Sequence, residues 1–189
     1  FIHHSTGENW LRADYGGLGQ ALAENNYFVS DTNYGWGTDI IGDYTDLGHW
    51  WTWFRGPSSA TYMSEVYGEY GQHYSNGWSY SRLTDPTGVN EIVMFKSCFP
   101  NSSALTSPST PIPNIDDNTM KGQAVGGTYT VANAKGIYLD LLNYFGAHTD
   151  KLFVAIVMPP VASPDTPYAR EFANWLVDDW LDNYQYNNV

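Results

Sequence analysis

The chain has 189 residues, a length typical of one compact domain. Hydrophobic residues make up 42% and charged residues 15%, which excludes disorder driven by charge. Eight Lys and Arg against 20 Asp and Glu give a net charge of −12, which disfavours nucleic acids and anionic membranes because both require clustered cations. Cys98 is the single cysteine, so the sequence holds no internal disulfide and no multi-cysteine zinc site. No apolar run reaches the roughly 18 residues of a membrane span.

The residues at both ends of the sequence resemble parts of secondary-structure elements. Residues 1–2 resemble the end of a strand, and residues 186–189 resemble a loop that leads into another strand. We therefore expect a single domain over residues 1–189 that is incomplete at both ends. Abundant Tyr, Trp, Asn, Ser, Thr and Gly beside few basic residues favour a secreted or cell-surface protein, and Asn101-Ser102-Ser103 is a glycosylation sequon.

Short apolar runs alternate with helical patterns along the chain. The predicted strands and helices are, in chain order, a strand at 1–4, a helix through 18–22, strands at 27–30 and 91–95, a helix over 132–145, a strand at 151–158 and a helix over 167–184. Runs that are apolar throughout, alternating with amphipathic helices, predict an α/β fold with a mainly parallel sheet between helices. Two long, less regular insertions, 33–88 and 102–130, interrupt the pattern, and the first is rich in aromatic residues.

Polar clusters follow three of the predicted strands, at residues 3–7, 31–37 and 96–101. Ligands of open parallel sheets bind at the carboxyl ends of the strands, so these clusters mark the expected site. A serine at a strand-to-helix turn can present its hydroxyl there. Its own N–H, a glycine N–H and an asparagine amide can stabilise an oxyanion.

The order of these clusters resembles the SGNH (GDSL-like) hydrolase superfamily. The strings FIHHSTGENWL and VMFKSCFPNSS resemble those of a subgroup of bacterial exported proteins of this type. The resemblance implies a three-layer α/β/α, flavodoxin-like fold. It implies that Ser5 is the nucleophile, that Gly35 or Gly37 donates a backbone N–H, and that Asn101 donates its side-chain amide.

The sequence departs from the family pattern at three places. His3-His4 replaces the usual Gly-Asp before the serine, and Lys96-Ser97-Cys98 stands where a Gly-x-Asn-Asp block would begin. The family's Asp-x-x-His block, which holds the general base, follows a fifth strand, and that strand is expected to begin near Val189. The resemblance therefore implies a base beyond residue 189.

Each of these polar residues has a structural alternative. Ser5 could cap the following helix instead of acting as a nucleophile. His4 could contact substrate, and His3-His4 could hold a metal ion or serve packing. His49 could be a base or a substrate contact within the chain, or a structural histidine. Cys98 is expected to be inert, because Lys96 is its one nearby cation in the sequence.

The run of Asp31, Asp39, Asp43 and Asp46 supplies oxygen ligands that suit calcium, but its spacing is not that of an EF-hand loop. A solvated acidic loop is the competing interpretation. We expect no required cofactor, and calcium is the one ion that the sequence leaves open.

Aromatic residues in the first insertion have two interpretations. Trp36, Trp50 and Trp51 lie among Asp, Asn and Gly, as in surfaces that stack on sugar rings. The alternative is a lid over the sheet, in which these rings form a small core of their own.

Three functions of different classes remain open. The first is an exported serine esterase that removes an acyl group from a small molecule or a glycan. The second is a non-catalytic carbohydrate-binding or surface-assembly protein on the same scaffold, and a third, weaker one is a calcium-stabilised structural subunit. A glycan or small molecule is the expected partner in the first two, with no nucleic acid and no membrane insertion.

Overall fold

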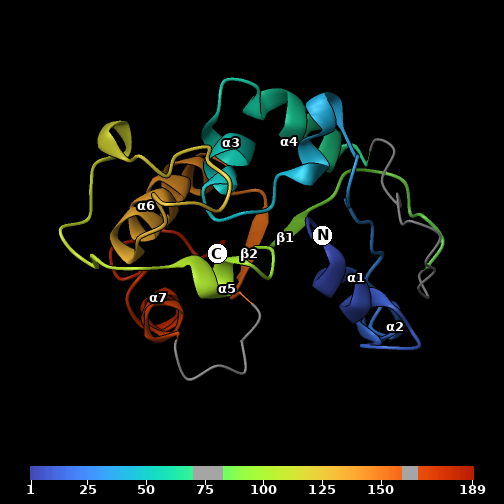
Figure 1. Ribbon diagram of the computed structural model, residues 1–189. Coiled ribbons are helices and arrows are strands. Elements are labelled where there is room, and N and C mark those ends of the chain that lie inside the picture. The colour runs from blue at the N-terminus through green and yellow to red at the C-terminus, as the bar shows by residue number, and fades with distance from the viewer. Residues whose placement is uncertain (70–82, 159–165) are drawn as a thin grey trace.

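The computed structural model describes residues 1–69, 83–158 and 166–189. Part of the first insertion, residues 70–82, lies outside these ranges. Figure 1 shows two strands in the middle of the molecule with helices around them. The elements in chain order are α1 (Ser5–Leu11), α2 (Leu18–Glu24), η1 (Thr38–Asp43), α3 (His49–Arg55), α4 (Ser59–Tyr67), β1 (Ile92–Lys96), α5 (Asn101–Ala104), η2 (Ile115–Asp117), α6 (Val131–Ala147), β2 (Leu152–Ile156) and α7 (Pro167–Asp178).

Strands β1 and β2 form a parallel ladder in which Ile92 pairs with Leu152 and Lys96 with Ile156. Both strands were predicted from their continuous apolar runs. The ladder confirms the α/β prediction at this level, because helices alternate with parallel strands. The described residues contain no further strand of regular length beside this pair.

Neither of the first two predicted strands forms a regular strand: the first keeps isolated parallel bridges at Ile2, and the second, at 27–30, makes none, because the bridge on that side lies at Thr32. Ile2 bridges to Thr32 on one side and to Phe95 of β1 on the other. The Ile2 N–H donates to the carbonyl of Met94 at 2.8 Å, and the Thr32 N–H donates to the carbonyl of Phe1 at 2.9 Å. The chain segments that precede the three polar clusters therefore run side by side in one direction. Figure 1 places the N-terminus next to β1 accordingly.

An aromatic core joins the strands to the helices of the first insertion and to α6. The ring of Phe54 lies 5.2 Å from both Phe95 and Phe145, and 6.0 Å from Phe153. Phe145 stacks on Phe153 at 4.2 Å. The first insertion thus supplies core residues through α3, rather than only a loop over the sheet.

The helices predicted at 132–145 and 167–184 correspond to α6 and α7, and only the C-terminal end of α7 differs by more than two residues. Thr130 caps α6 by accepting a hydrogen bond from the N–H of Asn133, and Pro167 occupies the first turn of α7, where its missing N–H costs nothing. Helix α7 ends at Asp178, six residues before the predicted end. Acidic residues at 178, 179 and 182 oppose the negative end of a helix dipole, which explains the early stop.

The helix expected after the first strand is two short helices. Gly17 separates α1 from α2 and has a φ of 68°. This left-handed conformation suits glycine and breaks a continuous helix. As a result, Ser5 begins a separate seven-residue helix at the edge where the parallel segments end.

Candidate functional site

Ser5 lies at the carboxyl edge of the parallel segments, and its side chain is exposed. It is the first residue of α1, whereas His4 occupies the capping position. Among the described residues, no side chain caps this helix by a hydrogen bond. The capping alternative for Ser5 is therefore not realised in this arrangement, and its hydroxyl is left for other contacts.

Tyr34 is the residue that meets Ser5. Its ring stacks on that of His4, with centroids 3.7 Å apart and planes inclined by 26°. Burial raises the pKa of the Tyr34 hydroxyl, the nearby Cys98 raises it further, and hydrogen bonds from the side chain and backbone of Ser5 partly oppose this shift. A raised pKa keeps the Tyr34 hydroxyl protonated at neutral pH, so that it can donate a hydrogen bond. Sequence reasoning did not assign Tyr34 to this site.

The predicted glycine donors lie next to Tyr34, but one of them is already engaged. Gly35 and Gly37 have φ angles of 74° and 79°, which only glycine adopts easily. The Gly35 N–H donates to Oδ1 of Asp43 at 2.7 Å. Gly35 therefore holds its own loop closed, and an oxyanion would have to displace Asp43 to use it.

Asn101 is fully buried, and both ends of its amide are used. Its Nδ2 donates to Oδ1 of Asp46 at 2.7 Å and to the carbonyl of Cys98 at 2.8 Å. Its Oδ1 accepts from the N–H of Leu47 at 2.9 Å. The structure places Asn101 as a link between the turn after β1 and the loop before α3, which corrects its assignment as a free oxyanion donor.

His3 is buried and ties the first turn to the second. Its Nε2 lies 3.1 Å from Oδ2 of Asp31, and its Nδ1 lies 3.1 Å from the carbonyl of His4. Nε2 of His3 thus faces a carboxylate and Nδ1 faces a backbone carbonyl, so both ring nitrogens are engaged by neighbouring groups of the fold.

His4 is also buried, beside Ser5 in the sequence. Its Nε2 donates to the carbonyl of Gly42 at 2.6 Å. Burial lowers the pKa of His4 to about 4, although the bond to Gly42 acts in the opposite direction. His4 is therefore neutral at pH 7, and its stacking on Tyr34 positions that ring rather than offering a broad surface to a ligand.

His49 begins α3 and is paired with Asp46, three residues earlier. The N–H of Asp46 donates to Nδ1 of His49 at 3.2 Å, and Oδ2 of Asp46 lies 3.9 Å from the same nitrogen. Because Nδ1 accepts, the neutral ring carries its hydrogen on Nε2. Burial lowers the pKa of His49, which also favours the neutral ring.

Asp46-Leu47-Gly48-His49 has the Asp-x-x-His spacing that the family uses for its base. We expected such a block only after Val189, and this signal was overlooked within the sequence. The contact of Asn101 with Asp46 connects the block to the turn after β1. The structure therefore brings an acid–histidine pair to the same edge of the strands as Cys98, whose carbonyl also contacts Asn101.

Lys96 and Cys98 complete this edge. Lys96 is fully buried, donates to the carbonyl of Ser97 at 2.8 Å and lies 5.8 Å from the ring of Trp10. Burial lowers its pKa to about 8. Burial also raises the pKa of Cys98, which favours the protonated thiol.

The tryptophans of the first insertion belong mainly to the core. Trp36 is 3% exposed and Trp50 is completely buried, with its Nε1 donating to Oγ of Ser97 at 2.7 Å. Neither ring has a free face for a sugar, which corrects their assignment as substrate contacts. Trp51 is half-buried with Lys121 Nζ 5.1 Å from its ring, and it keeps some surface.

The acidic run does not gather around one point. Asp31 contacts His3, Asp39 accepts from the hydroxyl of Tyr62 at 2.9 Å, and Asp43 and Asp46 bind the partners given above. In the described parts of the chain, no three His, Cys, Asp or Glu side chains are grouped to hold a metal ion. Likewise, no helix within residues 1–69, 83–158 and 166–189 is long and apolar enough to cross a bilayer.

Comparisons of the chain with models of protein families, with curated proteins and with solved structures found no match. The functional argument therefore rests on the geometry of this edge.

Proposed function

We propose that the protein is a serine-dependent acyl hydrolase of the SGNH type, with Ser5 as its nucleophile, acting on an acylated small molecule or glycan. The observation that carries this proposal is the exposed Ser5 at the carboxyl edge of the parallel segments, with its hydroxyl and N–H against Tyr34. A hydroxyl that is exposed and not used for capping suits attack on a substrate.

The proposed three-layer, flavodoxin-like arrangement is supported by the order of the parallel contacts. Thr32 neighbours Ile2, Ile2 neighbours β1, and β1 neighbours β2. The Phe153 N–H donates to the carbonyl of Asn188 at 2.8 Å, so the C-terminal segment adds to the far side of β2. In this order the turns after Ile2 and after β1 flank the point at which the order of the segments reverses, and ligands of such sheets bind at that point.

The proposed reaction has two steps. Oγ of Ser5 bonds to the acyl carbon, the bond from that carbon to the alcohol oxygen breaks, and the alcohol leaves with a proton. Water then adds to the acyl carbon and releases the carboxylic acid and Ser5. The protonated hydroxyl of Tyr34 and the N–H of Ser5, which would exchange their mutual contact for the substrate oxygen, are the donors that we assign to the oxyanion, in place of Gly35 and Asn101.

His49 is the proton acceptor that we propose within the chain. In the present arrangement its Nε2 carries the hydrogen and cannot accept a proton. If the N–H of Asp46 gives up its bond to Nδ1, the ring hydrogen can shift to Nδ1, toward Oδ2 of Asp46 at 3.9 Å; this frees the lone pair of Nε2 and gives an acid–histidine relay.

Replacing Ser5 with Ala tests the nucleophile. Release of p-nitrophenol from p-nitrophenyl acetate and of acetate from acetylated xylo-oligosaccharides is expected to fall by at least about a thousand-fold. Thr6→Ala, which removes the neighbouring hydroxyl, is the matched control and should keep its activity. His49→Ala should lose activity to a similar degree; if it does not, the base lies elsewhere, as the family resemblance implies.

Labelling by a fluorophosphonate separates the hydrolase from a non-catalytic binding protein. The wild-type protein should react at Ser5, and Ser5→Ala should not. A folded wild-type protein that neither hydrolyses these esters nor reacts with the probe would refute the proposed function and leave the binding alternative.

A further inference from the structure

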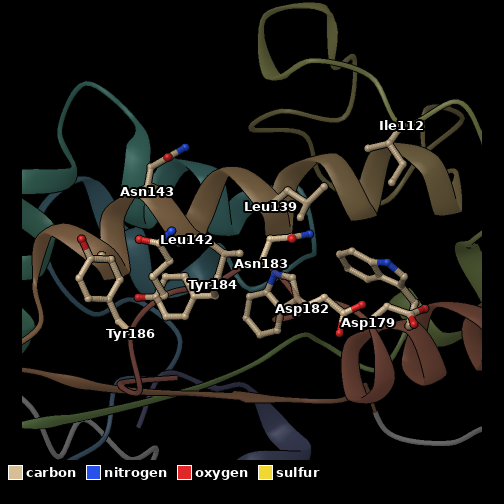
Figure 2. A pocket seen from close by; sticks show the side chains of 13 residues that line it. Ile112, Leu139, Leu142, Asn143, Asp179, Asp182, Asn183, Tyr184 and Tyr186 are labelled. Carbon is tan, nitrogen blue, oxygen red and sulfur yellow. The ribbon is translucent and has the colours of Figure 1, made fainter.

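A groove on the far side of α6 and α7 uses none of the residues of the Ser5 edge. It has a volume of about 520 Å³ and lies between the middle of α6, the end of α7 and the segment 179–186. Figure 2 shows Tyr184 and Tyr186 at one end, Asp179 and Asp182 at the other, and Asn183 between them. Rings and hydrogen-bonding groups thus line one hollow.

We infer that this groove binds a neutral oligosaccharide. This inference does not depend on the hydrolysis proposed for Ser5, since the two sites share no residue. Three properties of the groove support a neutral saccharide: the kind of rings that line it, the way in which they are held, and its charge.

The rings are partly exposed and firmly supported. Tyr186 packs against Gly146 of α6, where a side chain would collide with the Tyr186 ring, and it meets Tyr184 edge-on at 5.4 Å. The Tyr184 hydroxyl donates to Oδ1 of Asn188 at 2.8 Å. Trp175 stacks on Phe172 at 5.9 Å. Aromatic rings held in place without a closed core around them offer the flat apolar surface on which sugar C–H faces stack.

The polar groups suit hydroxyls. Trp175 lies in the last turn of α7 and Asp179 directly follows the helix, and both residues line the groove. Asn183 and Gln185 add exposed amides, which both donate and accept. Carboxylates and amides beside an aromatic ring can bind the hydroxyls of a pyranose at its edge while the ring covers its face.

The charge of the groove selects against acidic ligands. Asp179 and Asp182 face it, and none of the described residues that line it is a lysine, arginine or histidine; Nζ of Lys135 lies 5.7 Å from the ring of Trp175, but it is paired with Oε1 of Glu171 at 3.7 Å. The whole chain carries a net charge of −12. A polyanionic glycan or a nucleic acid would be repelled, whereas a neutral saccharide avoids this cost.

Titration with neutral hexasaccharides tests the inference. Cellohexaose, xylohexaose and mannohexaose would each be added to the wild-type protein, with binding followed by calorimetry and by tryptophan fluorescence. We expect saturable 1:1 binding of at least one of them. Tyr186→Ala and Trp175→Ala should each weaken it by about ten-fold, the loss expected for one stacked ring.

Two controls make the result specific to the groove. Tyr15→Ala removes a tyrosine that is 74% exposed, against 53% for Tyr186, and lies outside the groove; its binding should be unchanged. Ser5→Ala should also bind normally, so that failure of the groove and failure of the hydrolase are told apart. Hydrogen exchange of the wild-type protein, which needs no variant, should show protection of residues 182–186 by the bound saccharide.

Three outcomes would overturn the inference. They are no saturable binding of any neutral hexasaccharide, binding that survives both Tyr186→Ala and Trp175→Ala, and tighter binding of hexagalacturonate than of every neutral chain.

Discussion

His4 stands between Ser5 and the loop that carries Tyr34, and its protonation state affects the whole edge. The ring is buried, its Nε2 is bound to Gly42, and the titratable groups around it are His3, Asp43 and Lys96. Burial lowers its pKa from 6.5 to about 4. Loss of hydration is the main cause of this shift and the charge of Lys96 a minor one, so the fold favours the neutral ring.

The free energy of unfolding should therefore depend on pH through His4. The pKa of His4 is lower in the folded chain than in the unfolded one, so its stabilising contribution is complete above pH 6.5 and is lost as the pH falls toward 4. The loss should be on the order of 3 kcal/mol. Urea unfolding between pH 8 and pH 4 would measure it. His4→Gln keeps an N–H donor but does not titrate, and it should show a flatter profile; parallel profiles would contradict this account.

At the scale of elements, α3 and α6 are joined by one ion pair at the rim of the aromatic core. Arg55, the last residue of α3, donates from Nε to Oδ2 of Asp140 at 3.0 Å and from Nη2 to Oδ1 at 3.4 Å. Asn143 also donates to Oδ1 of Asp140, at 3.1 Å. Asp140 is buried whereas Arg55 is partly exposed, so most of the cost of breaking the pair falls on the carboxylate.

Arg55→Met should lower the free energy of unfolding by about 1–3 kcal/mol, because it leaves a buried carboxylate with weaker compensation. The double variant Arg55→Met with Asp140→Leu should recover part of this loss, since both charges are then gone. Thermal and urea unfolding of the two variants would measure the difference. A double variant that is less stable than Arg55→Met would show that the pair acts through something other than charge burial.

At the scale of the whole molecule, Asn188 connects the C-terminal segment to α6 and β2. Its Nδ2 lies 3.0 Å from the carbonyl of Phe145, and 3.2 Å from those of His148 and Lys151. Its own carbonyl accepts from Phe153. One buried side chain thus closes the turn between α6 and β2 and holds the segment that carries Tyr184 and Tyr186.

Asn188→Ala should therefore destabilise the protein by about 2 kcal/mol, because three carbonyls lose a donor. Asn187→Ala, at the exposed neighbouring position, is the matched control and should change stability by less than about 0.5 kcal/mol. Urea unfolding of both variants would test this. Equal effects at the two positions would show that the C-terminal segment is not anchored as described.

Hydrophobic patterns over a few residues predicted the strands and helices that bury one or both of their faces. The continuous apolar runs at β1 and β2 and the apolar stripe of α6 each identified an element within a few residues. The first insertion lacks a regular pattern over most of its length, and no helix is predicted there. The structure nevertheless forms α3 in it, and Trp50, Trp53 and Phe54 have the spacing of a buried helical face. The many aromatic rings of the first insertion suggested a binding surface. The side chains that bury these rings, such as Phe95, come from distant segments of the chain.

The sequence by itself determined the alternation of strands and helices and the exposed turn that carries Ser5, because periodicity and turn residues act over a few positions. Only the tertiary structure decided which polar groups are free. Gly35 and Asn101 are suitable donors in the sequence, yet Asp43 and Asp46 occupy them across 8 and 55 residues of chain. The reverse holds for Tyr184 and Tyr186, which have no distinctive local pattern and line a groove because Asn188 and Gly146 hold them there. Hydrogen bonds and burial depend on which segments meet in space, and that cannot be inferred from neighbours along the chain.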